Sequence, residues 1–208
     1  MKALEINTKI KNFDDFKKCI EANPEGVVLL EGKRDIPPEW AVRAEAVGAF
    51  LAKTFPKLLF RSGNAAGADE AFSKGVASVD VSRLHVIMPF EGHRQKSQIA
   101  GAAYDSPKAY TAEQEEEIFR RSVIASPNRK DYLARRHMPK GIGANYLMRD
   151  TMKVVGHPEK FSPAICGLFY VDPADPLGGG TGHTIRVCLD AEVPAFTQAV
   201  WGEWVDVS

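Results

Sequence analysis

The chain has 208 residues, of which 44% are hydrophobic and 26% are charged, a composition typical of a globular domain rather than of a disordered or fibrous protein. Lysine plus arginine and aspartate plus glutamate number 27 each, which argues against binding of nucleic acid through bulk positive charge but still allows a local basic face. No segment reaches the roughly 18 apolar residues of a membrane helix, and the N-terminal residues have no signal-peptide core, so we expect a cytoplasmic protein that does not enter a membrane.

Helices and short apolar strands alternate along the first half of the chain. VVLL at 27–30 and LLF at 58–60 contain no polar residue and are typical of strands buried on both faces. Pro38 suits the first turn of a helix, and apolar residues follow it at helical spacing up to Pro56. The predicted elements are, in chain order, a helix at 12–22, a strand at 27–30, a helix at 38–56, a strand at 58–60, a helix ending near residue 77 and a strand at 84–89.

The second half begins with residues 90–110, which have no clear periodicity and predict a long functional or inserted loop. Thr111 and Gln114 have the spacing of a capping box, which predicts the start of a helix. AICGLFYV at 164–171 predicts another strand buried on both faces. The later elements are predicted to be helices at 111–125, 130–137 and 142–156, a strand at 164–171, a helix over 181–192, a strand at 193–196 and an edge strand at 200–205.

This alternation predicts an α/β fold, with a Rossmann-like, mainly parallel sheet and helices on both faces. We expect one domain over residues 1–208, with its core at about 26–198. In such folds ligands bind beyond the carboxyl ends of the strands, where the strand order switches. The rule selects four loops, at 31–38, 61–69, 89–95 and 172–184.

The turn within RSGNAAGADEAF, residues 61–72, has the features of an anion site. Gly63 and Gly67 permit a close backbone approach and a positive φ, and the helix that follows begins with free amides and a partial positive charge. Such a turn binds phosphate or carboxylate without a basic side chain, and Ser62 and Asn64 can add hydrogen bonds. The alternative is a tight turn with a serine or asparagine cap and no ligand.

A second glycine-rich turn, LGGGTGHT at 177–184, follows a predicted strand and opens a helix. Consecutive glycines are costly in backbone entropy, so packing alone explains them poorly. Two helix starts at one edge of a sheet would face the same ligand. The candidate ligand-binding residues of this turn are Gly178, Gly179, Gly180, Thr181, Gly182 and Thr184.

No cofactor or metal site is indicated by the remaining motifs. Neither turn has the GxGxxG or GxxxxGK[ST] spacing, so a standard dinucleotide site or an ATPase is not expected. Cys19, Cys166 and Cys188 are too far apart in sequence for a metal motif or a disulfide framework, and predict small buried side chains. His93 and His183 fall near the predicted ligand edge, but no HxxxH or HExxH spacing accompanies them.

Both glycine turns resemble motifs of the SLOG superfamily, a group of Rossmann-like proteins that includes the DNA-processing protein A family, YpsA-like proteins and the LONELY GUY nucleotide hydrolases. SGNAAGAD is similar to the SGGxxGxD motif of that group, and GGGTGHTIR is similar to its GGT-x-x-T motif. VVLLEGKRDIPP resembles the first strand of the family, and NYLMRDTM resembles the helix before its fourth strand. The match in element order covers roughly residues 26–198, and only the two glycine motifs are sharp.

The resemblance implies a nucleotide or nucleotide-derived ligand at the two glycine turns. The residues that it places in or around the pocket are Arg34, Asn64, Asp69, Asn145 and Arg149. From the residues alone, Asp69 equally suits compensation of a helix dipole, while Arg34 and Arg149 equally suit solvated or paired positions.

The sequence leaves catalysis open. The nucleotide hydrolases of the superfamily contain a motif similar to PGGxGTxxE. Its glutamate assists cleavage of the N-glycosidic bond. The matching region here contains Thr184, Ile185 and Arg186, and an arginine cannot act as a general base at neutral pH. The neighbouring loops offer four carboxylates that could replace the glutamate, namely Glu31, Asp35, Glu91 and Asp172.

Three functions are therefore weighed. The first is binding of a nucleotide-like small molecule by a sensor or ligand-binding protein, and the second is hydrolysis of an N-glycosidic bond. The third is DNA binding, as in relatives of the DNA-processing protein A, through the basic run of Arg120, Arg121, Arg129, Lys130, Arg135, Arg136 and Lys140. The alternative for this run, which we favour, is a solvated helix face paired with EQEEE at 113–117. The resemblance also allows a homodimer.

Overall fold

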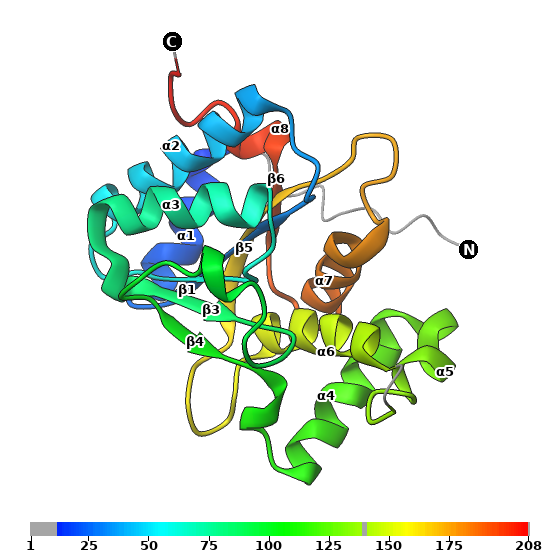
Figure 1. Ribbon diagram of the computed structural model, residues 1–208. Helices are drawn as coiled ribbons and strands as arrows, with labels where there is room; N and C mark the ends of the chain where they lie inside the picture. The colour runs from blue at the N-terminus through cyan, green and yellow to red at the C-terminus, as the bar shows by residue number, and fades with distance from the viewer. Residues whose placement is uncertain (1–11, 139–140, 208) are drawn as a thin grey trace.

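The computed structural model describes residues 12–138 and 141–207. Two earlier expectations concern residues outside this part. The N-terminal segment without a signal-peptide core includes residues 1–11, and the basic run includes Lys140. Six strands form one parallel sheet in the order β4-β3-β2-β1-β5-β6 (Figure 1). The strands are β1 (Val27–Gly32), β2 (Leu59–Ser62), β3 (Leu84–Ile87), β4 (Ala103–Asp105), β5 (Ala164–Tyr170) and β6 (Ala195–Thr197). The expected α/β, Rossmann-like fold class is confirmed.

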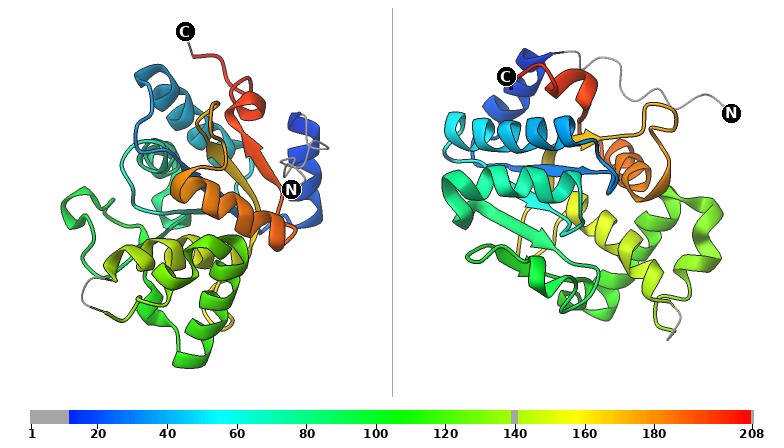
Figure 2. Two further views of the ribbon diagram at one scale, coloured as in Figure 1. Left: turned by 90° about the vertical axis from the view of Figure 1, so that its right-hand side faces the viewer. Right: turned by 45° about the horizontal axis from the view of Figure 1, so that its top comes forward.

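Helices cover both faces of the sheet (Figure 2). They are α1 (Phe13–Ala22), α2 (Pro38–Thr54), α3 (Ala68–Asp80), α4 (Ala112–Ala125), α5 (Lys130–Leu133), α6 (Ile142–Val155), α7 (Gly179–Asp190) and α8 (Gln198–Trp201). The predicted helix caps are present. The Asn12 side chain accepts hydrogen bonds from two backbone amides in the first turn of α1. Thr111 forms a capping box with Gln114 at the start of α4. Within residues 12–138 and 141–207, no helix has both the length and the apolar character needed to cross a bilayer.

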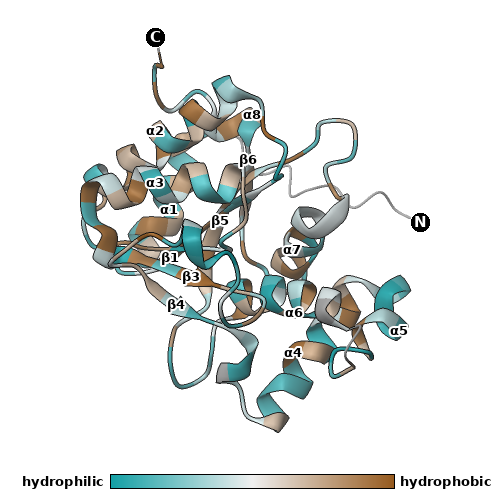
Figure 3. Cartoon of the chain, viewed as in Figure 1, coloured by the Kyte–Doolittle hydropathy of each residue, from teal (hydrophilic) through white to brown (hydrophobic). Residues whose placement is uncertain are grey.

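Alternate residues of the central strands pack against opposite helix layers. Val28 and Leu30 of β1 belong to the core that includes Phe16 of α1 and Val47 of α2, whereas Leu29 belongs to a second core beneath α7. This alternation follows from the period of two in a strand. Because both faces are covered, the central strands are apolar throughout most of their length (Figure 3). Glu31 lies two residues after Leu29, so its side chain enters the α6–α7 layer.

The strand order reverses between β1 and β5. The chain adds β2, β3 and β4 successively on one side of β1 and then returns to place β5 on the other side. The loops after β1 and β5 therefore diverge at their carboxyl ends, which is where ligands bind in open parallel sheets.

Two elements differ from the sequence-based expectation. Residues 90–110 were expected to form only a loop, but residues 103–105 pair with β3 as the short edge strand β4. Residues 200–205 were expected to form an edge strand, but α8 and a following turn occupy them. The Gln198 side chain bonds to both backbone groups of Val171, and the Trp201 indole donates to the Phe169 carbonyl. These side-chain contacts satisfy backbone groups near the end of β5 and anchor α8 as a helix.

Helices α2 and α3 cross closely at two glycines. A Cβ at Gly48 would lie 2.5 Å from the Phe72 carbonyl oxygen, and a Cβ at Gly75 would collide with the carbonyl of Glu45. Backbone atoms cannot move aside as easily as the end of a flexible side chain. The contact therefore depends on the absence of side chains at both positions.

We predict that Gly75→Ala lowers the free energy of unfolding by about 1–2 kcal/mol, because overpacking against backbone outweighs the roughly 1 kcal/mol gain in helix propensity. Chemical denaturation provides the measurement. Lys53→Ala, on the exposed side of α2, is the matched control and should change stability by less than about 0.5 kcal/mol. An unchanged or raised stability of Gly75→Ala would contradict the close-packing interpretation.

Candidate functional site

A cavity of about 580 Å³ opens at the carboxyl ends of β1 and β5. Residues 31–35 at the end of β1 and several residues between 171 and 181 after β5 contribute to its wall. Ala65 and Asp69 from the first glycine turn and residues of α5 and α6 complete it. Both glycine turns thus line the same cavity. Its volume lies in the usual range for small-molecule sites, and its position is the strand-order switch.

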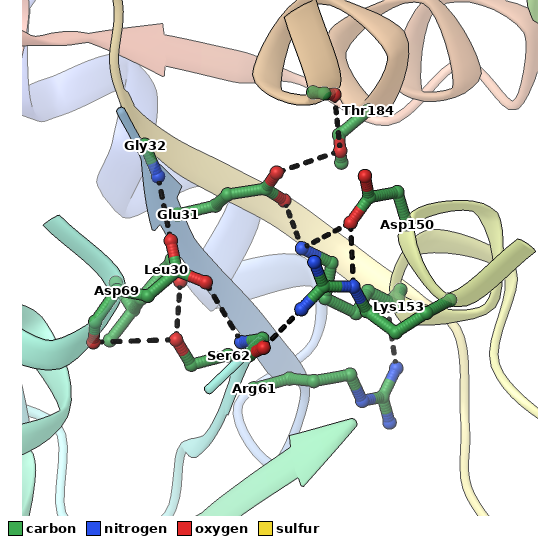
Figure 4. Close-up of polar contacts among 12 residues, drawn as sticks. Leu30, Glu31, Gly32, Arg61, Ser62, Asp69, Asp150, Lys153 and Thr184 are labelled. Carbon is green, nitrogen blue, oxygen red and sulfur yellow. Dashed lines mark hydrogen bonds and ion pairs between the residues drawn. The ribbon is translucent and has the colours of Figure 1, made fainter. Parts of the chain in front are cut away.

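Five buried charged residues form the floor of this cavity and are called the floor cluster: Glu31, Asp69, Arg149, Asp150 and Lys153 (Figure 4). Each is at most 4% exposed. They come from the end of β1, the first turn of α3 and two turns of α6. All except Lys153 line the cavity directly.

Lys153 is the central cation of the floor cluster. Its Nζ lies 2.5 Å from Glu31 Oε2 and 3.0 Å from Asp150 Oδ1. Arg149 Nε lies 2.8 Å from Asp150 Oδ1, and its guanidinium also donates to the Gly63 carbonyl. Thr184 Oγ1 donates to Glu31 Oε1 at 2.9 Å. Buried charges need such partners, because each loses its hydration.

Asp69 supplies an internal anion to the first glycine turn. Its Oδ1 accepts the Gly32 amide at 3.0 Å and its Oδ2 accepts the Gly63 amide at 3.1 Å. A Cβ at Gly63 would lie 2.6 Å from Asp69 Oδ2 and 3.0 Å from Lys153 Nζ. Asp69 therefore connects the ends of β1 and β2, in addition to lying in the first turn of α3 where it compensates the dipole. The Gly63 amide is already used within the protein.

The floor cluster has three carboxyl groups but only two cations, so one carboxyl can hold a proton without leaving a charge uncompensated. Burial raises the pKa of Glu31 to about 8, although Lys153 opposes the shift. Burial also raises the pKa of Asp69, again against Lys153 and Arg149. Burial disfavours ionisation of Asp150 as well, but Arg149 and Lys153 outweigh it and lower that pKa. Within the floor cluster, Glu31 and Asp69 are therefore more readily protonated than Asp150.

The second glycine turn forms the open N-terminus of α7. The first helical hydrogen bond runs from the Gly182 amide to the Gly178 carbonyl at 2.9 Å. The three preceding amides, those of Gly179, Gly180 and Thr181, therefore have no acceptor within the helix. Gly178 to Thr181 line the cavity. Gly179 has a φ of 62°, which favours glycine.

Two arginines and two tyrosines complete the cavity wall. Arg34 and Arg129 are exposed, and no acidic side chain among residues 12–138 and 141–207 lies within ion-pair distance of either one. The Arg34 guanidinium lies 5.6 Å from the ring centroid of Tyr146, which lines the cavity together with Tyr132. Sequence reasoning selected Arg34 but missed both tyrosines as site residues. It placed Arg129 only in a basic run, because no motif surrounds it.

The other candidate residues divide into cavity-lining and bracing groups. Seven line the cavity: Arg34, Asp69, Arg149, Gly178, Gly179, Gly180 and Thr181. Seven do not: Ser62, Gly63, Asn64, Gly67, Asn145, Gly182 and Thr184. Ligand binding by any of these fourteen residues stays a prediction.

Most of the non-lining residues brace the loops. Ser62 Oγ donates to the Leu30 carbonyl at 2.9 Å, and the Asn64 amide donates to the His93 carbonyl at 2.8 Å. Gly67 has a φ of 82°, and a Cβ there would collide with the backbone carbonyls of residues 33 and 34. Gly182 packs in the same manner against the Leu177 backbone.

The two histidines near the expected ligand edge do not line the cavity. His183 is fully buried, with Nδ1 2.8 Å from Ser126 Oγ and Nε2 3.0 Å from Thr151 Oγ1. Burial lowers its pKa to about 4, so the ring is neutral near pH 7. The His93 ring packs edge-on against Tyr146, with centroids 5.6 Å apart. No residue of the selected loop 89–95 lines the cavity.

Three residues of the basic run pair with the preceding acidic segment. Arg120 and Arg121 contact Glu117 at 2.8 Å, and Arg136 contacts Glu115 at 2.6 Å and Glu116 at 2.8 Å. This part of the run has the paired helix surface that we favoured, whereas Arg129, Lys130 and Arg135 form no ion pair with a described residue.

Metal ligands are not grouped in the described part of the chain, where no three His, Cys, Asp or Glu residues could together hold an ion. Cys166 and Cys188 are buried and Cys19 is partly buried, and all three are free thiols.

No protein-family model matches the chain, and no curated protein matches it. Among solved structures, the chain is similar to DNA processing protein A from Helicobacter pylori, which is described as having a unique single-stranded DNA binding mode. The identity is 13%, the TM-score is 0.44, and the alignment covers 86% of this chain and 67% of that chain. A likeness of this degree assigns neither a family nor a function.

We predict that Lys153→Met lowers the free energy of unfolding by about 3–5 kcal/mol, because Glu31 and Asp150 lose a buried cation. Adding Glu31→Gln to this variant should restore part of the loss, since fewer buried acids then lack a partner. Lys33→Met is the matched control, because its ion pair with Asp172 is partly exposed and worth at most about 1 kcal/mol. A Lys153→Met protein as stable as the control in urea would refute this role.

We also predict that the contribution of Glu31 to stability falls as the pH rises from about 4.5 to about 8. In this window the unfolded Glu31 has released its proton while the folded Glu31 retains it, since its pKa rises from 4.5 to about 8. The folded state then binds more protons, so the slope of unfolding free energy against pH is negative. In urea denaturation across this range, the stability of the wild type relative to Glu31→Gln should fall as the pH rises. Parallel profiles would contradict a raised pKa at Glu31.

Proposed function

We propose that this chain is a SLOG-type protein that binds a nucleotide or nucleotide-derived small molecule in the cavity, as a sensor or ligand-binding protein. The observation that carries the proposal is the convergence of three kinds of group on one cavity. These are amides without intrahelical acceptors, cations without acidic partners, and aromatic rings.

The cations suit the phosphate of such a ligand. Arg34 and Arg129 can each donate two parallel hydrogen bonds to phosphate oxygens. The start of α7 adds three amide donors for other oxygen atoms of the ligand. At the first glycine turn the Gly63 amide already donates to Asp69. The α7 turn is therefore the stronger candidate for a ligand-binding turn.

The aromatic rings suit the base. Tyr132 is 42% exposed, and Tyr146 lines the cavity beside it. Stacking on such rings tolerates any base, because every base has a π-face. The aromatic part of the wall therefore suits stacking of any nucleotide base and does not select among the bases.

A second candidate, hydrolysis of an N-glycosidic bond, is favoured by Glu31. Thr184 lies in the region that matches the glutamate of the nucleotide hydrolases, and it donates to Glu31. The Glu31 carboxyl thus reaches the same neighbourhood from β1. A carboxyl with a pKa near the working pH suits general acid–base chemistry.

We predict that nucleoside monophosphates raise the melting temperature of the protein, because a ligand that binds only the folded state stabilises it. Arg34→Ala and Arg129→Ala should each weaken binding by about ten-fold or more, as expected for loss of hydrogen bonds to a charged group. Lys96→Ala, which removes an exposed cation outside the cavity, should bind like the wild type.

The same incubations separate the two candidates. Release of free base, abolished by Glu31→Gln, would favour hydrolysis over binding alone. A flat thermal response across all common mononucleotides, with no base released, would contradict both candidates.

A further inference from the structure

The first turn of α7 and the carboxyl of Asp150 meet at one point of the cavity. A Cβ built on Gly180 would lie 3.2 Å from Asp150 Oδ2, and outside α7 and the adjacent residues no other atom of the described chain lies within 4 Å of it. Both residues line the cavity. A hydrogen-bond acceptor therefore lies beside a set of backbone donors.

The two oxygens of Asp150 have different surroundings (Figure 4). Oδ1 contacts Lys153 at 3.0 Å and Arg149 at 2.8 Å. Oδ2 receives no hydrogen bond from any residue in the described part of the chain, and it is not one of the fully buried side-chain atoms. Because Asp150 lines the cavity, Oδ2 is available to a donor supplied by a ligand.

The charge of the cavity limits what that ligand group can be. Six carboxyl residues line the cavity, against four cationic residues. A phosphate at Gly180 would place its negative charge next to the ionised Asp150, because the pKa of that carboxyl is lowered by Arg149 and Lys153. A hydroxyl instead accepts a hydrogen bond from an amide and donates its own proton to a carboxylate.

We propose that Asp150 and the first turn of α7 bind a sugar hydroxyl, so that the ligand is a ribonucleotide whose ribose diol lies at Gly180 and whose phosphate faces Arg34 and Arg129. This inference rests on the proposed function and specifies its ligand. Asp150 Oδ2 accepts from the hydroxyl, and the free amides of α7 donate to the oxygen of the same diol. The site then discriminates ribose from deoxyribose.

Isothermal titration with ribonucleoside monophosphates and their 2′-deoxy and 3′-deoxy counterparts tests the proposal. The wild type should bind at least one deoxy form about ten-fold or more weakly than the ribonucleotide, the effect of one hydrogen bond to a charged acceptor. Asp150→Asn should reduce this preference, because the acceptor loses its charge. Asp35→Asn removes another cavity-lining carboxylate and should keep the preference.

Gly180→Ala provides the second variant, since Asp150→Asn removes a charge from the floor cluster and can unfold the protein. The added methyl occupies the space in front of Oδ2 and leaves every ion pair of the floor cluster intact. It should weaken ribonucleotide binding to the level of the deoxy form. Equal binding of ribo and deoxy forms by the wild type would overturn this inference and leave the proposed function standing. Absence of binding by all of them would overturn both.

Discussion

The hydrogen bond from Lys153 to Glu31 is the interaction on which the cavity depends. It joins the end of β1 to α6, and the hydrogen bond from Thr184 to the same carboxyl adds α7. Asp69 then ties the end of β1 to the turn after β2 through two backbone amides. Every element that frames the cavity floor is thus connected through the floor cluster rather than through apolar contacts alone.

A charged floor stabilises the packing of helices against a sheet less effectively than an apolar one. Buried ion pairs often contribute less to stability than apolar side chains of similar size, because desolvation offsets the attraction. The two apolar cores on either side of the sheet already bury residues such as Leu30 and Phe169 completely. Stability alone therefore does not explain five charged groups under a cavity. A preorganised polar surface does, because perturbed carboxyls and fixed donors gather at ligand sites.

The sequence predicts the architecture well because local patterns determine it. Fully apolar strands, helix caps and glycine turns each depend on neighbours within a few residues, so VVLL at 27–30 and the capping box at Thr111 were recognised directly. The edge strand β4 was missed because three half-exposed residues have no apolar periodicity. The helix α8 was missed because Gln198 and Trp201 are fixed by contacts with the end of β5, some 27 to 32 residues away.

The candidate site was harder to predict for the same reason. Glu31 and Lys153 are separated by 122 residues, and no local pattern relates them. Glu31 was named only as one of several acids that could replace a missing glutamate, and Lys153 was not considered. One signal was present in the sequence. Glu31 follows a fully apolar strand at the strand-order switch, so its side chain must be buried between the sheet and a helix. A buried carboxylate requires a cation nearby. Applied to helix 142–156, the same reasoning would have selected Lys153, which lies between buried apolar neighbours.

The two glycine turns show how similar sequences serve different purposes. In the first turn, Gly63 has no space for a side chain, and its amide and carbonyl are used by Asp69 and Arg149. In the second turn, Gly178 to Thr181 line the cavity, and Gly180 keeps the space in front of the Asp150 carboxyl open. A helix start attracts an anion in either case. The first turn of α3 contains an internal anion, Asp69, whereas the first turn of α7 contains no acidic residue. The two glycine turns therefore differ in charge, and the start of α7 is the one left without an anion from its own first turn.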